Sequence, residues 1–192
     1  MNKPYSYKLL KNIDVSNLVD FLEQYRHKID INTDFNTSYG REKCFINCNS
    51  YPIIDNFMIN DIQLHEIFFN TFDEIINLFY SNYGPGNFCK IQFSNLKSFG
   101  KIKTHYDGGL VYLWSHRIHI PIITNEKVIF NVDGIRKNIK LGEIVEVNNN
   151  KMHSVKNGGN QDRIHLILDY MPNEYYKIFS ELNLSHEHYK FN

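Results

Sequence analysis

The run Gly84-Pro85-Gly86 divides the chain into two parts that differ in how their apolar residues are spaced. Downstream of it, short runs rich in β-branched and aromatic residues follow one another closely, separated by turn residues. Asp133-Gly134 is one such turn, since a type I′ hairpin needs positive φ at both central positions. Many short strands at this spacing predict a small barrel or a two-sheet jelly roll. The expected strands are 88–94, 101–105, 110–114, 116–122, 127–132, 143–147 and 163–171.

Upstream of the break, the spacing is mainly helical. Apolar residues recur at helical intervals from residue 16 to about residue 28, and again from about residue 61 to residue 80. The second stretch carries an aromatic stripe that is typical of a helix packed onto a sheet. We therefore expect a mainly β fold with some α, a double-stranded β-helix (jelly roll, cupin-like) buttressed by N-terminal helices. The expected organisation is one domain over 1–192, with a helical support region (1–86), the double-stranded β-helix core (87–171) and a C-terminal segment (172–192).

Composition excludes several classes of protein. Lys and Arg together number 21, as do Asp and Glu, so no strong electric field recruits nucleic acid or an anionic membrane. No apolar run approaches the roughly 18–20 residues that a membrane helix needs, and the N-terminus does not have the pattern of a signal peptide. The surroundings of Cys44 and Cys48 offer no further zinc ligands, which favours reduced thiols. We expect a soluble cytoplasmic protein without nucleic-acid or membrane partners, and the oligomeric state is left open.

Metal chemistry is predicted at His105-Tyr106-Asp107, followed much later by His153. On an extended segment, residues i and i+2 point to the same face, so His105 and Asp107 can present an imidazole and a carboxylate to one point. A second imidazole from His153, on a later strand, would complete the two-histidine, one-carboxylate set of non-haem Fe(II) oxygenases. Such a set leaves three positions of an octahedral iron open, two for a 2-oxo acid and one for O2.

Arg163 adds a second element to this pattern. Its planar guanidinium binds a carboxylate through two parallel hydrogen bonds, which suits the far carboxylate of 2-oxoglutarate. The ten-residue step from His153 to Arg163 fits a hairpin that returns the arginine to the metal's side. A His-x-Asp tripeptide alone is weak evidence, because such tripeptides are common. The alternative is a non-catalytic, cupin-like metal-binding or sensor barrel, in which the same set would bind zinc or nickel and which has no need of Arg163.

From about residue 91 to residue 170, the chain resembles the aspartyl/asparaginyl β-hydroxylase family of Fe(II)- and 2-oxoglutarate-dependent oxygenases. The matching pieces occur in the family's order and at roughly its spacing. They are Gly-Lys-Ile-Lys-Thr-His-Tyr-Asp (100–107), His-Arg-Ile-His-Ile-Pro (116–121), Phe-Asn-Val-Asp-Gly (130–134), Leu-Gly-Glu-Ile-Val-Glu-Val (141–147), Met-His-Ser-Val-Lys-Asn (152–157) and Asp-Arg-Ile-His-Leu-Ile-Leu-Asp (162–169). The resemblance implies a double-stranded β-helix with iron at His105 and His153 and 2-oxoglutarate at Arg163.

The resemblance also implies roles for three further residues. His119 matches the histidine that bonds the C1 carboxylate of 2-oxoglutarate, and Arg117 matches an arginine that approaches a substrate carboxylate. Ser94 matches a serine that helps bind 2-oxoglutarate, although the intervening glycine is shifted by one position. Some animal members lack the metal-binding carboxylate, whereas Asp107 is present here. This difference places the chain with the members that use an ordinary triad.

The expected reaction is hydroxylation of a C–H bond of an amino-acid or peptidyl substrate, with O2 consumed and with succinate and CO2 as co-products. The transmembrane and repeat segments of the large animal enzymes are not found in this sequence, so their protein-domain substrates are not carried over. Small stand-alone members include hydroxylases of free amino acids such as proline. We further expect a core or supporting role for His165, a solvent-facing Glu146, and a frayed tail around His186 and His188.

Overall fold

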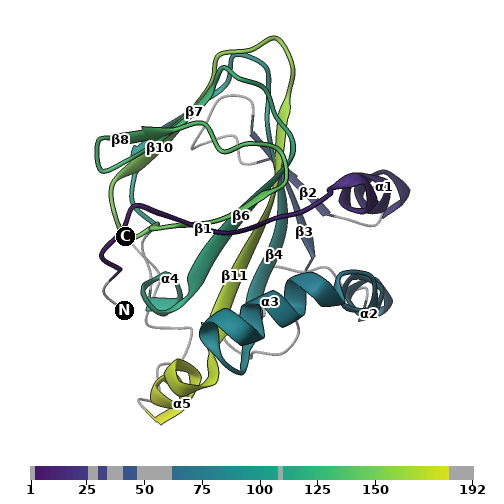
Figure 1. The fold of residues 1–192 in the computed structure, drawn as a ribbon, viewed down its shortest axis with the longest axis vertical. Helices are drawn as coiled ribbons and strands as arrows, with labels where there is room; N and C mark the ends of the chain where they lie inside the picture. The colour runs from purple at the N-terminus through teal and green to yellow at the C-terminus, as the bar shows by residue number, and fades with distance from the viewer. Residues whose placement is uncertain (1–2, 26–29, 34–40, 47–61, 108–109, 182–192) are drawn as a thin grey trace.

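The computed structural model describes residues 3–25, 30–33, 41–46, 62–107 and 110–181. Its strands form two antiparallel sheets that face each other (Figure 1). The larger sheet contains, in spatial order, β1 (Tyr7–Asn12), β9 (Glu143–Val147), β6 (His116–Ile123), β11 (Arg163–Pro172), β4 (Gly86–Leu96), β3 (Arg41–Ile46) and β2 (Asp30–Thr33). The smaller sheet contains β5 (Lys101–His105), β10 (His153–Asn157), β7 (Val128–Val132) and β8 (Ile135–Lys137). This two-sheet jelly roll is the predicted fold class.

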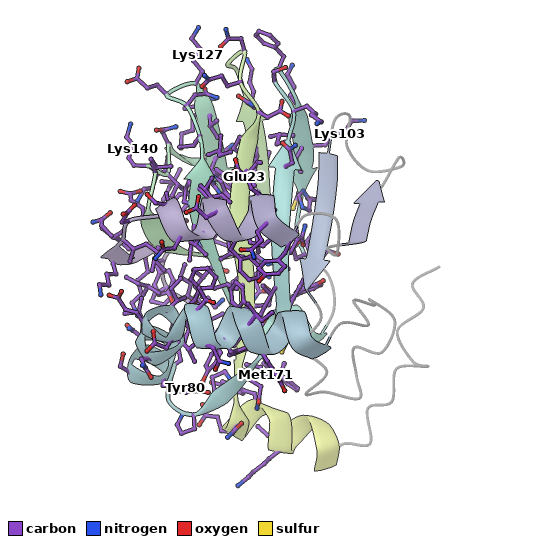
Figure 2. All side chains as sticks on the ribbon, turned by 90° about the vertical axis from the view of Figure 1, so that its right-hand side faces the viewer. Glu23, Tyr80, Lys103, Lys127, Lys140 and Met171 are labelled. Carbon is purple, nitrogen blue, oxygen red and sulfur yellow. The ribbon has the colours of Figure 1, made fainter. Side chains whose placement is uncertain are left out.

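Helices cover the outer face of the larger sheet. These are α1 (Ser16–Tyr25), α2 (Ile62–Thr71) and α3 (Asp73–Tyr83), and Figure 2 shows α1 and α2 crossing the strands. Their apolar stripes meet alternate residues of β4, β6 and β11 in one hydrophobic cluster, in which Phe21, Phe68, Phe72 and Phe79 are buried. The predicted support of the sheet by N-terminal helices is therefore present. Two short helices, α4 (Leu110–Trp114) and α5 (Asn173–Glu181), lie at one end of the molecule (Figure 1).

The space between the two sheets is partly apolar and partly polar. Because side chains alternate along a strand, the residues of β11 that do not face the helices point into the barrel. A second hydrophobic cluster fills one part of the interior and contains Leu96, Val128, Phe130, Val132, Ile139, Val145, Val147 and Val155. The polar inward residues are left to form the site described below.

The hairpin at Asp133-Gly134 is confirmed. Both residues have positive φ, at 53° and 80°, and β7 pairs with β8 through Val132 and Ile135 on either side of the turn. Within the described part of the chain, no helix is both long enough and apolar enough to cross a membrane.

Three expectations about the elements were wrong. The run 110–114 is the helix α4, because a five-residue apolar run has no period that separates helix from strand. The helix predicted from about 61 to 80 is two helices, which meet at Phe72. The described part of residues 1–86 also contains three strands that were not expected, since β1, β2 and β3 extend the larger sheet at its two edges.

Candidate metal centre and its cavity

The three predicted metal ligands lie together. His105 ends β5 and His153 begins β10, and the two residues are directly opposite each other in the strand pairing. Asp107 follows β5, where its backbone N–H donates to the carbonyl of Asn149 at 3.1 Å. Its Oδ1 atom lies 3.6 Å from Nε2 of His105 and 3.9 Å from Nε2 of His153. One ligand atom from each residue can be chosen so that all three lie within 4.8 Å of one another.

Both histidines are oriented as metal ligands require. Nδ1 of His105 lies 2.8 Å from the carbonyl oxygen of Lys103, and Nδ1 of His153 lies 2.9 Å from that of Lys151. A carbonyl oxygen only accepts hydrogen bonds, so Nδ1 carries the proton and the lone pair is on Nε2. Such a hydrogen bond on the distal nitrogen fixes the tautomer and the ring orientation of a ligating histidine. Two neutral imidazoles and one carboxylate are a donor set that suits Fe(II).

Arg117 holds the second oxygen of Asp107. Its Nη1 donates to Oδ2 of Asp107, while its Nε and Nη2 donate to the two oxygens of Asp169, each at 2.7 Å. Burial opposes the charge on Asp107, but the attraction of Arg117 outweighs it and brings the pKa of this carboxyl well below its usual range. Burial likewise opposes the charge on Arg117, and its two carboxylate partners raise its pKa above the ordinary value. Asp107 is therefore ionised, with Oδ1 turned to the histidines and Oδ2 fixed by the arginine.

The wall across from the metal ligands carries Arg163 and a pair of histidines. Arg163 is 1% exposed, and its guanidinium lies 5.0 Å from the centre of the Phe130 ring. His165 stacks on the same ring, and its Nδ1 lies 3.4 Å from Nδ1 of His119. Burial, and then the charge of Arg163, lower the pKa of both histidines well below the ordinary value, so both are neutral. His165 is thus part of the interior, as expected.

A single cavity connects these groups. Ser94 is buried on β4, directly opposite His165 in the strand pairing. The cavity is lined by every residue that the sequence assigned to the site: Ser94, His105, Asp107, Arg117, His119, His153 and Arg163.

Two residues of the site were not found from the sequence. Asp169 fits the family pattern, but a turn cap or a surface role was an equally good interpretation; it is fully buried as the partner of Arg117. Asn149 was not considered, yet it is fully buried and lines the cavity. Strand alternation was an available signal for both, since Asp169 lies six residues after Arg163 and Asn149 two residues after the inward-facing Val147.

The expectation that Glu146 faces solvent was wrong. It is fully buried on the outer face of β9, where it accepts hydrogen bonds from Tyr5, Tyr83 and His116. Nζ of Lys3 lies 3.1 Å from Oε1 of Glu146 and provides the counter-charge. Burial alone would raise the pKa of Glu146, but the hydrogen bond from His116 and the charge of Lys3 lower it to about 2. The expectations for Cys48, His186 and His188, and for the side chain of Cys44, lie outside the described residues.

Comparison with known proteins identifies a family. The family model for aspartyl/asparaginyl beta-hydroxylases matches residues 68–172, which is more than half of the chain. The matched region includes all seven predicted site residues as well as Asn149 and Asp169. The comparison with curated proteins found no match.

Several solved structures share the fold. A Burkholderia pseudomallei oxidoreductase of the 2OG-Fe(II) oxygenase family has a TM-score of 0.60 at 12% identity, covering 81% of this chain and 78% of its own. A Pseudomonas putida prolyl-4-hydroxylase has a TM-score of 0.58 at 11% identity, covering 88% and 94%. A Trichoplax adhaerens prolyl hydroxylase, solved with a peptide fragment of the hypoxia-inducible factor oxygen degradation domain, has a TM-score of 0.57 at 12% identity, covering 90% and 86%. At these identities the likeness is one of fold.

Proposed function

Because this chain belongs to the aspartyl/asparaginyl beta-hydroxylase family, we propose that it is an Fe(II)- and 2-oxoglutarate-dependent dioxygenase. Its reaction would hydroxylate a C–H bond of an amino-acid or peptidyl substrate, with succinate and CO2 as co-products. The observation that carries the proposal is the grouping of His105, Asp107 and His153, within 4.8 Å, in one cavity with the buried Arg163. A barrel that only stores or senses a metal has no need of that arginine.

In this proposal His105, Asp107 and His153 hold Fe(II) and leave its other positions to the 2-oxo acid and O2. Iron and 2-oxoglutarate, once bound, together supply the oxidant that removes hydrogen from the substrate carbon. The protein's own task is to orient these groups and to keep water away from them. The burial of most of the cavity-lining side chains suits that task.

Arg163 binds the far carboxylate of 2-oxoglutarate, because its guanidinium offers two parallel N–H donors. Phe130 and the sheet hold this side chain in place, so little conformational freedom is lost on binding. The neutral His119 bonds the C1 carboxylate, and the hydroxyl of Ser94 adds a further contact. These roles place 2-oxoglutarate along the wall formed by β4, β6 and β11.

Arg117 has two tasks in this proposal. Its bonds to Asp107 and Asp169 hold the ligating carboxylate in position. The predicted contact with the substrate would use an N–H of Nη1 or Nη2 that these two carboxylates do not engage, beside the ring of Tyr112, whose centre lies 4.6 Å from the guanidinium carbon.

An anaerobic titration tests the proposal. Fe(II) and then 2-oxoglutarate are added to the purified protein, and the visible charge-transfer band of the bidentate chelate is recorded. We expect the band in the unmodified protein, and at least a tenfold higher 2-oxoglutarate concentration for half-saturation in Arg163→Leu. Loss of a charge-assisted bidentate contact costs at least 1.4 kcal/mol, or about tenfold. Arg136→Leu, which removes an exposed arginine of β8, is the matched control.

The outcomes separate the candidates. Iron binding without the band would indicate the non-catalytic metal-binding or sensor barrel. If the band in Arg163→Leu reached half-saturation at the same 2-oxoglutarate concentration as in the unmodified protein, another group would bind the co-substrate. In air, screening free amino acids and short peptides for succinate release and for the gain of one oxygen atom would then identify the substrate.

A further inference from the structure

Asn149 is a buried polar side chain that has no role in the proposed binding of the metal or of 2-oxoglutarate. It is 0% exposed and lines the same cavity as the metal ligands. Neither its side-chain nitrogen nor its side-chain oxygen has a hydrogen-bond partner among the described residues. Leaving a buried donor or acceptor unsatisfied costs about 1–3 kcal/mol, so a side chain with both atoms unsatisfied points to a ligand that satisfies them.

The neighbouring asparagine shows the contrast. The amide of Asn148 donates to the carbonyl oxygens of Lys3 and Tyr5, so it ties the turn to the N-terminal segment. Its side-chain oxygen accepts the backbone N–H of Asn150. Asn148 therefore has a structural task that Asn149 does not share.

The strand pairing places Asn149 at the opposite end of the cavity from Arg163. Val145 pairs with His119, so Val147 is level with Arg117 and Asn149 lies beyond it. Arg163 lies at the other end of β6, because its neighbour Ile164 pairs with Ile123. The carbonyl of Asn149 also accepts the N–H of Asp107, which brings Asn149 next to the metal ligands. This is the end of the cavity that the co-substrate, held by Arg163, leaves to the substrate.

The charges around the metal centre favour a neutral group at this end. Arg117, Arg163 and iron would together carry four positive charges, and Asp107, Asp169 and 2-oxoglutarate four negative ones. A further ionised group would be buried without a counter-charge, which is costly. A carboxamide matches a group that presents one acceptor and one donor side by side.

We propose that Asn149 is a substrate-binding residue whose carboxamide pairs with a neutral amide of the substrate, its Nδ2 donating to the amide carbonyl and its Oδ1 accepting from the amide N–H. The paired groups are either the C=O and N–H of a primary carboxamide or the backbone N–H and C=O of one residue of a peptide, because the C=O and N–H of a single trans peptide unit point in opposite directions. The inference rests on the proposed function, since it takes the end of the cavity beyond the metal as the substrate's place. It differs from the substrate carboxylate that the family resemblance implies for Arg117.

The test measures binding directly. Protein loaded with Zn(II), a diamagnetic substitute for Fe(II), and with 2-oxoglutarate is titrated with four small probes while the assigned side-chain NH2 signals of Asn149 are followed by NMR. N-acetylalanine N-methylamide carries the backbone N–H and C=O of one peptide residue, propionamide carries the primary carboxamide, and propionate and alanine are the charged counterparts. We expect at least one amide probe to shift the signals saturably, while the charged probes do not. The responding probe identifies which of the two amides is recognised.

Two variants complete the test. Asn149→Leu keeps the branched shape of the side chain and removes both polar atoms, and it should weaken binding of the responding amide by at least about tenfold. Asn148→Leu should lower stability and leave the affinity for the probe unchanged. The inference is overturned if no probe shifts the Asn149 signals, if the charged probes shift them equally, or if Asn149→Leu binds the amide as tightly as the unmodified protein does. The Fe(II)–2-oxoglutarate band is recorded on separate, anaerobic Fe(II)-loaded samples of the same proteins, so that its absence counts against the proposed function and not against Asn149.

Discussion

Replacing Asp169 with asparagine is the sharpest perturbation of the metal centre that touches none of its ligands. Asp169 is fully buried and accepts two 2.7 Å hydrogen bonds from Arg117. In Asp169→Asn, one accepting oxygen becomes an NH2 group that faces the guanidinium. Removing one partner of a buried ion pair costs about 3–5 kcal/mol. Arg117 keeps Asp107, so we expect a loss near the lower end, about 3 kcal/mol.

Urea unfolding measures this loss. With an m value of about 2 kcal/mol per molar urea, a loss of about 3 kcal/mol lowers the midpoint by about 1.5 M. Iron affinity should also fall, by about 10–100-fold, because the ion pair with Asp169 would no longer fix the position of Arg117, which hydrogen-bonds the ligand Asp107. Asp133→Asn is the matched control, since that carboxylate is exposed on a hairpin and pairs with Lys151 at the surface. If Asp169→Asn bound iron as tightly as the control, the reasoning that Asp169 positions the ligand through Arg117 would be refuted.

Two further predictions concern the scaffold. The pKa of Glu146 is lowered to about 2, below the 4.5 of an ordinary glutamate. The ionised Glu146 therefore contributes about 3 kcal/mol to the free energy of unfolding, which is complete above pH 4.5 and is lost as the pH falls toward 2. The difference in unfolding free energy between the unmodified protein and Glu146→Gln should narrow between pH 7 and pH 3.5, and a constant difference would contradict this prediction. Gly142→Ala should lower the free energy of unfolding by at least about 1 kcal/mol more than Gly134→Ala does, as measured by urea unfolding. Both glycines have positive φ, but an added Cβ at Gly142 would lie 2.2 Å from the carbonyl oxygen of Ile13, while one at Gly134 meets nothing within 4 Å. Equal losses in the two variants would contradict the predicted clash.

The grouping of His105, Asp107 and His153 was predictable because part of its signal is local in sequence. His105 and Asp107 fall on one face of an extended segment by simple alternation, which can be recognised before the strand's partners are known. Arg163 follows from the chemistry of the co-substrate. In contrast, Glu146 is covered by Lys3 and Tyr5 from the segment before β1 and by Tyr83 from the end of α3. No local sequence pattern reveals contacts with residues so far away in the chain.

The missed strands have the same explanation. The burial pattern of β1 shows no alternation, since it is an edge strand that pairs on one side only. Its pairing partner is known only once the whole sheet is known. The apolar run of α4 was misassigned because five residues are too few to show a period.

The pairing of β1 with β9 also sets the order in which this protein can assemble as it is synthesised. Tyr7 pairs with Val147, so the first strand has no partner until 140 further residues have been made. At about 5–20 residues per second, that delay is on the order of ten seconds. Throughout it, the carbonyls of Lys3 and Tyr5 lack the amide of Asn148, and Asp107 lacks the carbonyl of Asn149. The turn that borders the metal centre therefore closes late, and a ribosome that stalls before residue 147 leaves a chain with neither its sheet edge nor its site.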